Sequence, residues 1–460
     1  MSSREREKRQ KFLRLMFQQY YRNHAADIDI PDRLHMREFA LETWEYTWRC
    51  TRRAETDASG QTVYVGCGRK GTAIQRPSVC PVCNSPTVTS TNWSRHLGFR
   101  TAKAMRSELA ARAPHSVYHS AAFYNIPVAR DMQEKQWQGA ELVFDIDADH
   151  LDAPCTQEHD SWVCANPNCM KTGWGEPPEQ GCPSCGGLEF HRRKWICDRC
   201  MDDARRNTLR VYDEFLVGDF GIDSDQIVIN YSGHRGYHIR VRDPRVFKLD
   251  SAARVEIAHE ITGVGFDGNS VVGTTLNIPQ APARSLAGWG GRVVDAIVNL
   301  IRNIDSYEGG QHWVSRLKRN REAIIAGLLK NPPEFWRGAG ISVKSWREIA
   351  TVAVAMYGGK IDVPVTHDVH RVIRLIGSIH GKTGFVVAKL TRESIEDFDP
   401  FADALAFGAD NLRVRVLGGL LEVPRFRIGD ELYGPYGDEV VDLPMSAAMF
   451  LLCKGVAVLG

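Results

Sequence analysis

The stretch Leu142-Val143-Phe144-Asp145-Ile146-Asp147 is an apolar run that ends in two acids. A short apolar run of this kind predicts a buried β-strand. Strand side chains alternate between faces, so Asp145 and Asp147 project from the same face, ~7 Å apart along the chain. Two carboxylates that close repel each other unless a cation lies between them, and Mg²⁺ or Mn²⁺ suits oxygen ligands. The alternative is a strand end whose acids are simply solvated.

A second stretch, Ser232-Gly233-His234-Arg235-Gly236-Tyr237-His238, concentrates hydrogen-bond donors between two apolar runs at 227–231 and 237–242. Its glycines predict a tight hairpin whose backbone approaches a ligand closely. Ser232, His234 and Arg235 suit a triphosphate, because arginine makes bidentate contacts with oxyanions. The alternative is a solvated hairpin with a satisfied histidine.

A third charged cluster lies within residues 361–384, where three glycines separate polar side chains. Its members are Asp362, Asp368, Arg371, Arg374, His380 and Lys382. Arg371 and Arg374 stand three residues apart, which predicts that they share one side of a helical turn. The cluster suits a phosphate-rich substrate and a third metal-ligating acid. The alternative is an exposed charged loop.

The cysteines of this chain are grouped in pairs rather than scattered. Twelve are present, and three pairs have CxxC spacing, which in a reducing compartment indicates metal rather than disulfides. The segment 155–200 holds seven of them together with His159 and His191, so we expect structural zinc there, with two pairs closing one tetrahedral site.

The composition narrows the class of protein. The 460 residues are 43% hydrophobic and 25% charged, which excludes wholesale disorder. A net charge of +2 excludes a basic coat for nucleic acid, so any phosphate binding must use a local cluster. The longest apolar candidate, 445–459, is broken by Lys454, and no membrane span is expected. The N-terminus lacks a secretory pattern, which favours the cytoplasm.

The chain divides by pattern into five parts. Residues 1–45 read as helical, with a second short helix over 34–44, and 46–90 form a zinc-ribbon-like insertion with a strand at 62–65. Residues 91–285 form a mixed α/β core that contains helices at 93–113 and 204–220 and the zinc segment 155–200. A helical insert follows at 286–355, and 356–460 complete the core.

Four stretches, 118–122, 142–149, 231–238 and 361–384, together resemble the small catalytic subunit of archaeal and eukaryotic DNA primase, with the archaeal branch closer. The resemblance implies an α/β (α+β) catalytic core of the archaeo-eukaryotic primase superfamily. Its expected features are two layers around mixed sheets, an RNA-recognition-like element, zinc-binding insertions and a helical insert. It implies a nucleotidyltransferase, a DNA-directed RNA polymerase that makes short primers during DNA replication.

The resemblance also assigns roles to residues. Asp145, Asp147 and Asp362 match the ligands of two catalytic Mg²⁺ or Mn²⁺ ions, with Asp368 as the fallback for the third acid. The positions that match nucleotide contacts are Ser232, His234, Arg235, His238, Arg371, Arg374 and His380. Expected partners are a large primase subunit in a heterodimer, a single-stranded DNA template and ribonucleoside triphosphates.

The family has a zinc knuckle after the acidic pair, and Cys155, Cys197 and Cys200, with His159, match it. Two inserts depart from the family. Cys164, Cys169, Cys182 and Cys185 predict a second zinc site. Cys50, Cys67, Cys80 and Cys83 suit a third, although Cys50 also suits a hydrophobic core.

Two rival functions remain at this point. One is a primase-polymerase of the same superfamily that acts in repair or on mobile elements. The other is a catalytically inactive zinc-ribbon protein that binds nucleic acid.

Overall fold

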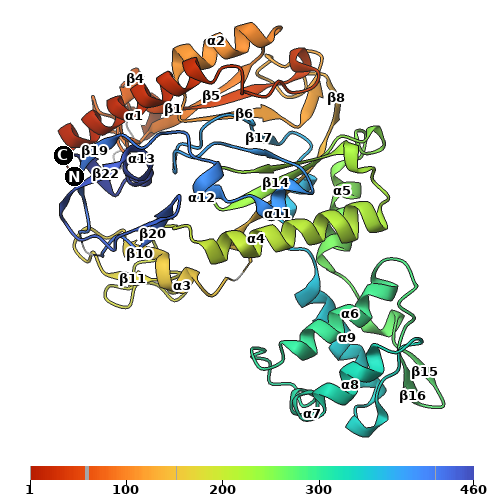
Figure 1. Ribbon diagram of the computed structural model, residues 1–460. Coiled ribbons are helices and arrows are strands. Elements are labelled where there is room, and N and C mark those ends of the chain that lie inside the picture. Colours follow the sequence, from red (N-terminus) through yellow and green to blue (C-terminus); the bar gives the residue numbers. More distant parts are fainter. Residues whose placement is uncertain (1, 57–61, 152, 420) are drawn as a thin grey trace.

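The computed structural model describes residues 2–56, 62–151, 153–419 and 421–460. Figure 1 shows a large lobe of helices and sheets, which contains both termini, and a smaller helical lobe beside it. The two termini lie next to each other, at the edge of the large lobe that is farthest from the helical lobe. Within the described ranges, no helix is long and apolar enough to cross a membrane.

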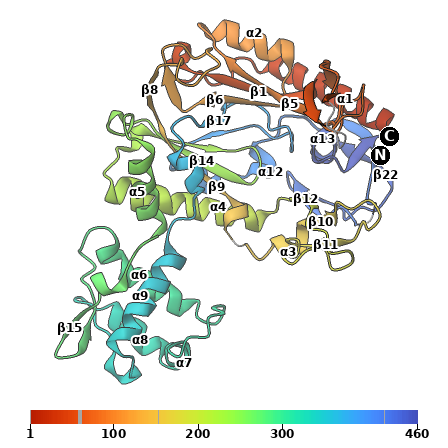
Figure 2. The ribbon, with the colours of Figure 1, turned by 180° about the vertical axis from the view of Figure 1, so that it is seen from behind.

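The inner sheet of the large lobe carries the acidic run. Its order is β18-β13-β14-β9, with all pairs antiparallel; the bounds are β9 Leu142–Asp147, β13 Ile227–Tyr231, β14 Gly236–Val241 and β18 Lys389–Leu390. β13 and β14 are buried along their whole length, because other elements cover both faces of the sheet. The predicted strand and the predicted hairpin are both confirmed, and β9 and β14 lie side by side in Figure 2.

Glycine at position 236 is required for this pairing. Gly236 stands opposite Asp147, and a Cβ at this position would lie 1.9 Å from the carbonyl oxygen of Ile146. Any side chain there would push β14 away from β9. The hairpin glycine therefore holds the acidic strand in register.

A second sheet lies above the inner one. Its path is β17-β6-β1-β4, with β5 also paired to β1; the bounds are β1 Phe39–Cys50, β4 Lys70–Ala73, β5 Val88–Leu97, β6 Ser116–Ser120 and β17 Val372–Arg374. The helix predicted over 34–44 is wrong, because only a single 3₁₀ turn, Leu34–Met36, precedes β1. Trp44, Tyr46 and Trp48 alternate with polar residues, and this period of two favours a strand.

Helices cover the outside of the large lobe. The main ones are α1 Ser3–Asn23, α2 Ala102–Arg112, α4 Asp198–Arg210, α5 Ser251–Thr262 and α13 Met445–Lys454. α1 begins with a capping box between Ser2 and Glu5. The helix predicted over 93–113 begins only at Ala102, since 88–97 is strand. The helix predicted at 204–220 comprises the second half of α4 and the π-helix η3 (Val211–Asp219) that follows it.

Smaller strands and helices complete the large lobe. They are β2 Arg53–Thr56, β3 Thr62–Val65, β7 Ala122–Tyr124, β8 Trp137–Ala140, β10 Ser161–Cys164, β11 Thr172–Trp174, β12 Phe190–Arg193, β19 Asn411–Val416, β20 Phe426–Ile428, β21 Glu431–Tyr433, β22 Val440–Pro444, β23 Ala457–Leu459, α3 Thr156–His159, α10 Val363–His367, α11 Ser394–Asp397 and α12 Pro400–Asp403. Every paired strand in the described parts of the chain is antiparallel. This differs from the mixed sheets that the resemblance implied.

The helical lobe follows α5. It contains β15 Gly273–Thr275, β16 Ile278–Gln280, α6 Trp289–Arg302, α7 Val314–Arg319, α8 Arg321–Leu328 and α9 Val343–Tyr357. The predicted apolar face of α6 is buried, from Val293 to Ile301. This lobe coincides with the change to helical pattern in the sequence.

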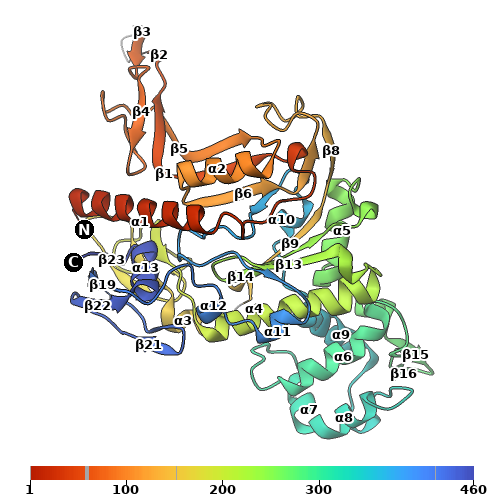
Figure 3. The same ribbon diagram turned by 45° about the horizontal axis from the view of Figure 1, so that its top comes forward.

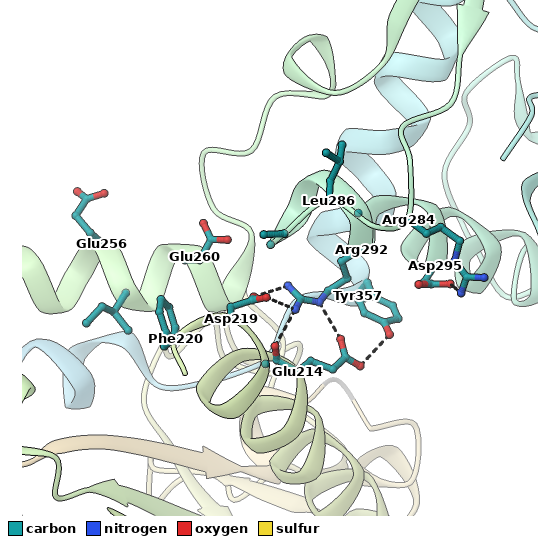
Figure 4. A pocket seen from close by; sticks show the side chains of 15 residues that line it. Glu214, Asp219, Phe220, Glu256, Glu260, Arg284, Leu286, Arg292, Asp295 and Tyr357 are labelled. Atoms are coloured by element: carbon teal, nitrogen blue, oxygen red, sulfur yellow. Dashed lines mark hydrogen bonds and ion pairs between the residues drawn. The ribbon is translucent and has the colours of Figure 1, made fainter. Parts of the chain in front are cut away.

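An ion-pair cluster joins the helical lobe to the large lobe, beside a cavity of about 960 Å³ (Figure 4). Arg292 of α6 pairs with Glu214 at 3.0 Å and with Asp219 at 2.8 Å, both on η3. The Tyr357 hydroxyl at the end of α9 donates to Glu214 at 3.0 Å. One guanidinium thus connects two lobes through partly buried charges.

We expect Arg292→Ala to lower the free energy of unfolding of the helical lobe by roughly 3 kcal/mol, because two partly buried carboxylates would lose their cation. Thermal unfolding and hydrogen exchange over 289–357 measure the loss. Arg302→Ala is the matched control, since Arg302 is an exposed arginine of the same helix with no ion pair to any described residue. Equal stability of the two variants would contradict the assigned role of Arg292.

Candidate active site

Three segments that are distant in sequence meet at the end of β9. β9 supplies Asp145 and Asp147, and β14 lies beside it with His238 opposite Asp145. The backbone N–H of Asp362, just before α10, donates to the carbonyl oxygen of Asp145 at 2.9 Å. This hydrogen bond brings the third charged cluster of the sequence to the acidic strand.

The two candidates for the third acid lie in different surroundings. The Asp362 side chain does not cap α10 and makes no hydrogen bond to any residue that the structure describes. The Asp368 carboxylate accepts from the backbone N–H of His370 at 2.9 Å, so it is engaged in its own turn. Asp362 is therefore the acid that is free to serve a ligand near Asp145.

Burial acts on the charges of the acidic strand. Burial raises the pKa of Asp145 to about 6, with Asp362 adding to the rise and Arg371 opposing it. Burial and the neighbouring Asp149 raise the pKa of Asp147. Carboxylates with raised pKa values gain from a bound cation, which restores the charged form. The donor set is oxygen only, as hard divalent cations prefer.

The carboxylates are more widely spaced than the thiol groups of the chain. In the described ranges, only three cysteine-containing groups bring their ligand atoms within 4.8 Å of one another, and the acids are not among them. A site with two ions ~3.5–4 Å apart does not require all three acids to meet at one point.

A cleft of about 850 Å³ opens beside the acids. It is lined by polar side chains from all three segments: Asp145, Asp147, Ser232, His234, His238, Arg374, His380 and Lys382. His234 and His380 stack with ring centroids 5.0 Å apart. Burial, together with Arg374 and Arg240, lowers the pKa of His238 to about 3, so this ring is neutral beside Asp145, 3.5 Å away.

Arg371 and Arg374 reach the site from a strand. The predicted helical turn is wrong, because Val372 and Ile373 are β-branched and form β17, which pairs with β6. Both arginines line a smaller cavity of about 340 Å³ next to Asp145. The Arg374 guanidinium lies 4.8 Å from the centre of the Tyr118 ring.

Arg235 lies apart from the other hairpin donors. Its guanidinium is fully buried and donates to Asp160 at 2.8 and 3.0 Å, to the Trp195 carbonyl at 2.9 Å and to Asp149. These contacts attach the hairpin to the cysteine segment. Their role is to hold the two segments together. Arg235 is not among the side chains that line the cleft.

Four basic residues that line the cleft lie outside the three clusters singled out by the sequence: Arg192, Arg193, Lys194 and Lys454. Lys454, the last residue of α13, donates to the Lys194 carbonyl at 3.0 Å, and its Nζ lies 3.1 Å from Nε2 of His234. Burial, together with the positive charges of Arg235 and Lys382, lowers the pKa of Lys454 to about 7. In the sequence, Lys454 is visible only as a lysine that interrupts the apolar run 445–459. This interruption alone does not indicate that the lysine reaches a distant site.

The cysteines gather into three groups, with the membership that the sequence predicted. They are Cys50, Cys67, Cys80 and Cys83; Cys155, His159, Cys197 and Cys200; and Cys164, Cys169, Cys182 and Cys185. Sulfur–sulfur distances of 3.2 to 3.7 Å within these groups approach the ~3.8 Å edge of a tetrahedron with 2.3 Å zinc–sulfur bonds. All three groups fit zinc, and Cys50 is a member of one as well as being buried.

Comparison with known proteins gives one consistent result. The family model described as DNA primase small subunit matches residues 191–392. The DNA primase small subunit PriS of Methanothrix thermoacetophila is 33% identical over 397 residues, which cover 80% of this chain and 89% of the relative. PriS of Methanococcoides burtonii is 30% identical, covering 80% and 88%. PriS of Methanosarcina barkeri is 28% identical over 493 residues, covering 98% and 96%.

The family model covers the hairpin and the third charged cluster, and the relatives cover 80% to 98% of this chain. The resemblance found in the four sequence stretches is thereby confirmed. The chain belongs to the DNA primase small subunit family.

Proposed function

We propose that this chain is the catalytic subunit of a DNA primase, which makes short RNA primers on single-stranded DNA by nucleotidyl transfer. The observation that carries the proposal is the hydrogen bond from the Asp362 backbone N–H to the Asp145 carbonyl, which brings a third acid to the strand whose two acids line a cleft with cationic and histidine side chains. Buried acids facing basic groups are what phosphoryl chemistry needs, since it depends on positioning and charge stabilisation.

Asp145, Asp147 and Asp362 would hold two Mg²⁺ or Mn²⁺ ions. When bound, such ions lower the pKa of an attacking 3′-hydroxyl and neutralise charge on the leaving pyrophosphate. The raised pKa of Asp145 supports this role, because the bound cation would supply the stabilisation that the buried site lacks.

The cleft residues would hold the incoming ribonucleoside triphosphate. Ser232, His234 and His380 offer donors to phosphate oxygens, and Arg371, Arg374 and Lys382 supply positive charge. His238, neutral beside Asp145, would donate a hydrogen bond rather than a charge. Arg235 would not contact the nucleotide. It would act indirectly, by holding the hairpin against the cysteine segment.

The finer features of the fold are part of the same proposal. The inner sheet with α4 would be the RNA-recognition-like element, and residues 286–355 would be the insert that distinguishes the lobes. The chain would work as a heterodimer with a large primase subunit. Zinc in the three cysteine-containing groups would be structural, because each group closes a long excursion of the chain.

The acid assignment is tested by primer synthesis on a single-stranded template with labelled ribonucleotides and Mg²⁺ or Mn²⁺. We expect Asp145→Asn and Asp362→Asn each to reduce synthesis by at least about 100-fold, because charge stabilisation in the transition state would be lost. Asp368→Asn is the matched control and should stay within about threefold of wild type, since Asp368 caps a turn.

Unchanged zinc content and unfolding temperature in all three variants would show that the loss is chemical. Full synthesis by Asp362→Asn would overturn the third-acid assignment. Loss in Asp368→Asn with full activity in Asp362→Asn would transfer the role to Asp368.

The zinc assignment is tested by elemental analysis of the purified chain, in which we expect three zinc ions per chain, one for each group. Cys197→Ser should lose one zinc and unfold at a lower temperature, because Cys197 also caps the N-terminus of α4. Cys83→Ser should lose one zinc with a smaller change in stability, since Cys83 is exposed in a peripheral group. Two or fewer zinc ions in the wild type would contradict the assignment.

A further inference from the structure

The first cysteine-containing group belongs to an arm that projects from the large lobe. We call residues 46–90 the N-terminal arm; Figure 3 shows its strands β2, β3 and β4 extending away from the rest of the molecule. The arm is an extension of the second sheet, because β1 pairs with β6 through Phe39–Glu42 and with β4 through Tyr46–Arg49. Its position is therefore set by strand pairing with the core.

One face of the arm is polar and exposed. Strand register places two cross-strand rows on this face: Lys70, Arg49 and Thr89 form one, and Thr72, Thr47 and Thr91 form the other. All six residues are exposed, whereas Trp48 and Cys50, which point to the other face, are buried. A shallow groove of about 630 Å³ lies along these rows.

The arm is also a basic part of a nearly neutral chain. Residues 49–88 contain six Lys or Arg and two Asp or Glu, although the whole chain has a net charge of only +2. Across the described ranges, Arg49 and Lys70 form no ion pair, so their charges remain available. Exposed threonine hydroxyls beside free cations are the groups that contact phosphate oxygens and sugars in nucleic-acid complexes.

The polar face is continuous with the acidic site through β5. Thr89, Thr91 and Trp93 fall at every second position of this strand, and Trp93 lines the small cavity that contains Asp145, His238 and Arg374. Trp93 packs against Tyr118 with centroids 4.7 Å apart. Four residues of strand span roughly 13 Å, the length of about four stacked nucleotides.

We propose that the exposed face of β1, β4 and β5 in the N-terminal arm binds the sugar–phosphate backbone of single-stranded DNA template where it passes the catalytic cleft. The identity of the ligand rests on the proposed primase function. Arg49 and Lys70 contact phosphates, and Trp93 offers a ring on which a base stacks. Thr72 and Thr91 add neutral hydrogen bonds, whereas the Thr47 and Thr89 hydroxyls already donate to backbone carbonyls. The contacts are independent of base sequence.

Binding of fluorescent oligo-dT to the full chain tests this surface. The two oligomers have about 5 and about 20 nucleotides, which lie near the lower end and above the upper end of the roughly 4–16 nucleotides that a single-strand site covers. We expect Arg49→Ala plus Lys70→Ala to weaken binding of the long oligomer about tenfold and to leave the short one unchanged. The slope of log affinity against log salt should fall by about 1.4, because each single-strand phosphate contact contributes about 0.7.

Arg319→Ala plus Lys344→Ala, which removes the same charge from exposed positions of the helical lobe, is the matched control and should change neither oligomer. Zinc content should stay at the wild-type value in both double variants. The arm variant should raise the template KM for primer synthesis and leave kcat unchanged, since neither residue lines the acidic cleft.

Equal affinity and equal salt slope for the arm variant and the wild type would overturn the proposal. An arm variant that binds DNA normally but no longer binds a partner protein subunit would also overturn it. The two hypotheses fail separately. Wild-type protein that binds the long oligomer through the arm but makes no primer would contradict the proposed function alone. Normal primer synthesis with an arm variant that binds DNA normally would contradict this inference alone.

Discussion

The pairing of β9 with β14 is the constraint on which the site depends. It places His238 opposite Asp145 and Gly236 opposite Asp147, so the acids and the donors of the hairpin share one register. A slip of one residue would turn Asp145 and Asp147 to the other face and move the hairpin away from them. Asp362 joins Asp145 through a backbone hydrogen bond. The rest of the third segment is held by the pairing of β17 with β6 and by the Thr383 hydroxyl, which donates to the Gly233 carbonyl.

Charge explains why so many cationic groups surround this pairing. Carboxylates at the end of a buried strand are costly unless opposite charge is near. The fold supplies Arg371 and Arg374 from β17, Arg235 behind the hairpin and Lys454 from α13. These cations come from three different parts of the fold, so the large lobe must be assembled before the acids are compensated. Zinc groups that tie the excursions in place would serve the same end.

Local patterns predicted the parts of the fold that depend on near neighbours. The apolar run of β9, the glycines of the hairpin and the apolar face of α6 each carry their structure in consecutive residues. The cysteine groups were predictable because ligand spacing is a sequence property. The sequence does not predict β1, because its first residues lack clear alternation. Arg371 and Arg374 are predicted on a helical turn, because their spacing alone cannot distinguish a turn from a strand. Lys454 was beyond reach, since only tertiary packing brings α13 to His234.

The strand β1 has an irregularity where the N-terminal arm leaves the core. Between the pairs Glu42–Trp93 and Thr47–Thr91, four residues of β1 stand opposite one residue of β5. Such a bulge separates two registers, so pairing on its outer side is independent of pairing on its inner side. A change in the length of the arm can therefore leave the inner strands, and the acids beneath them, in place.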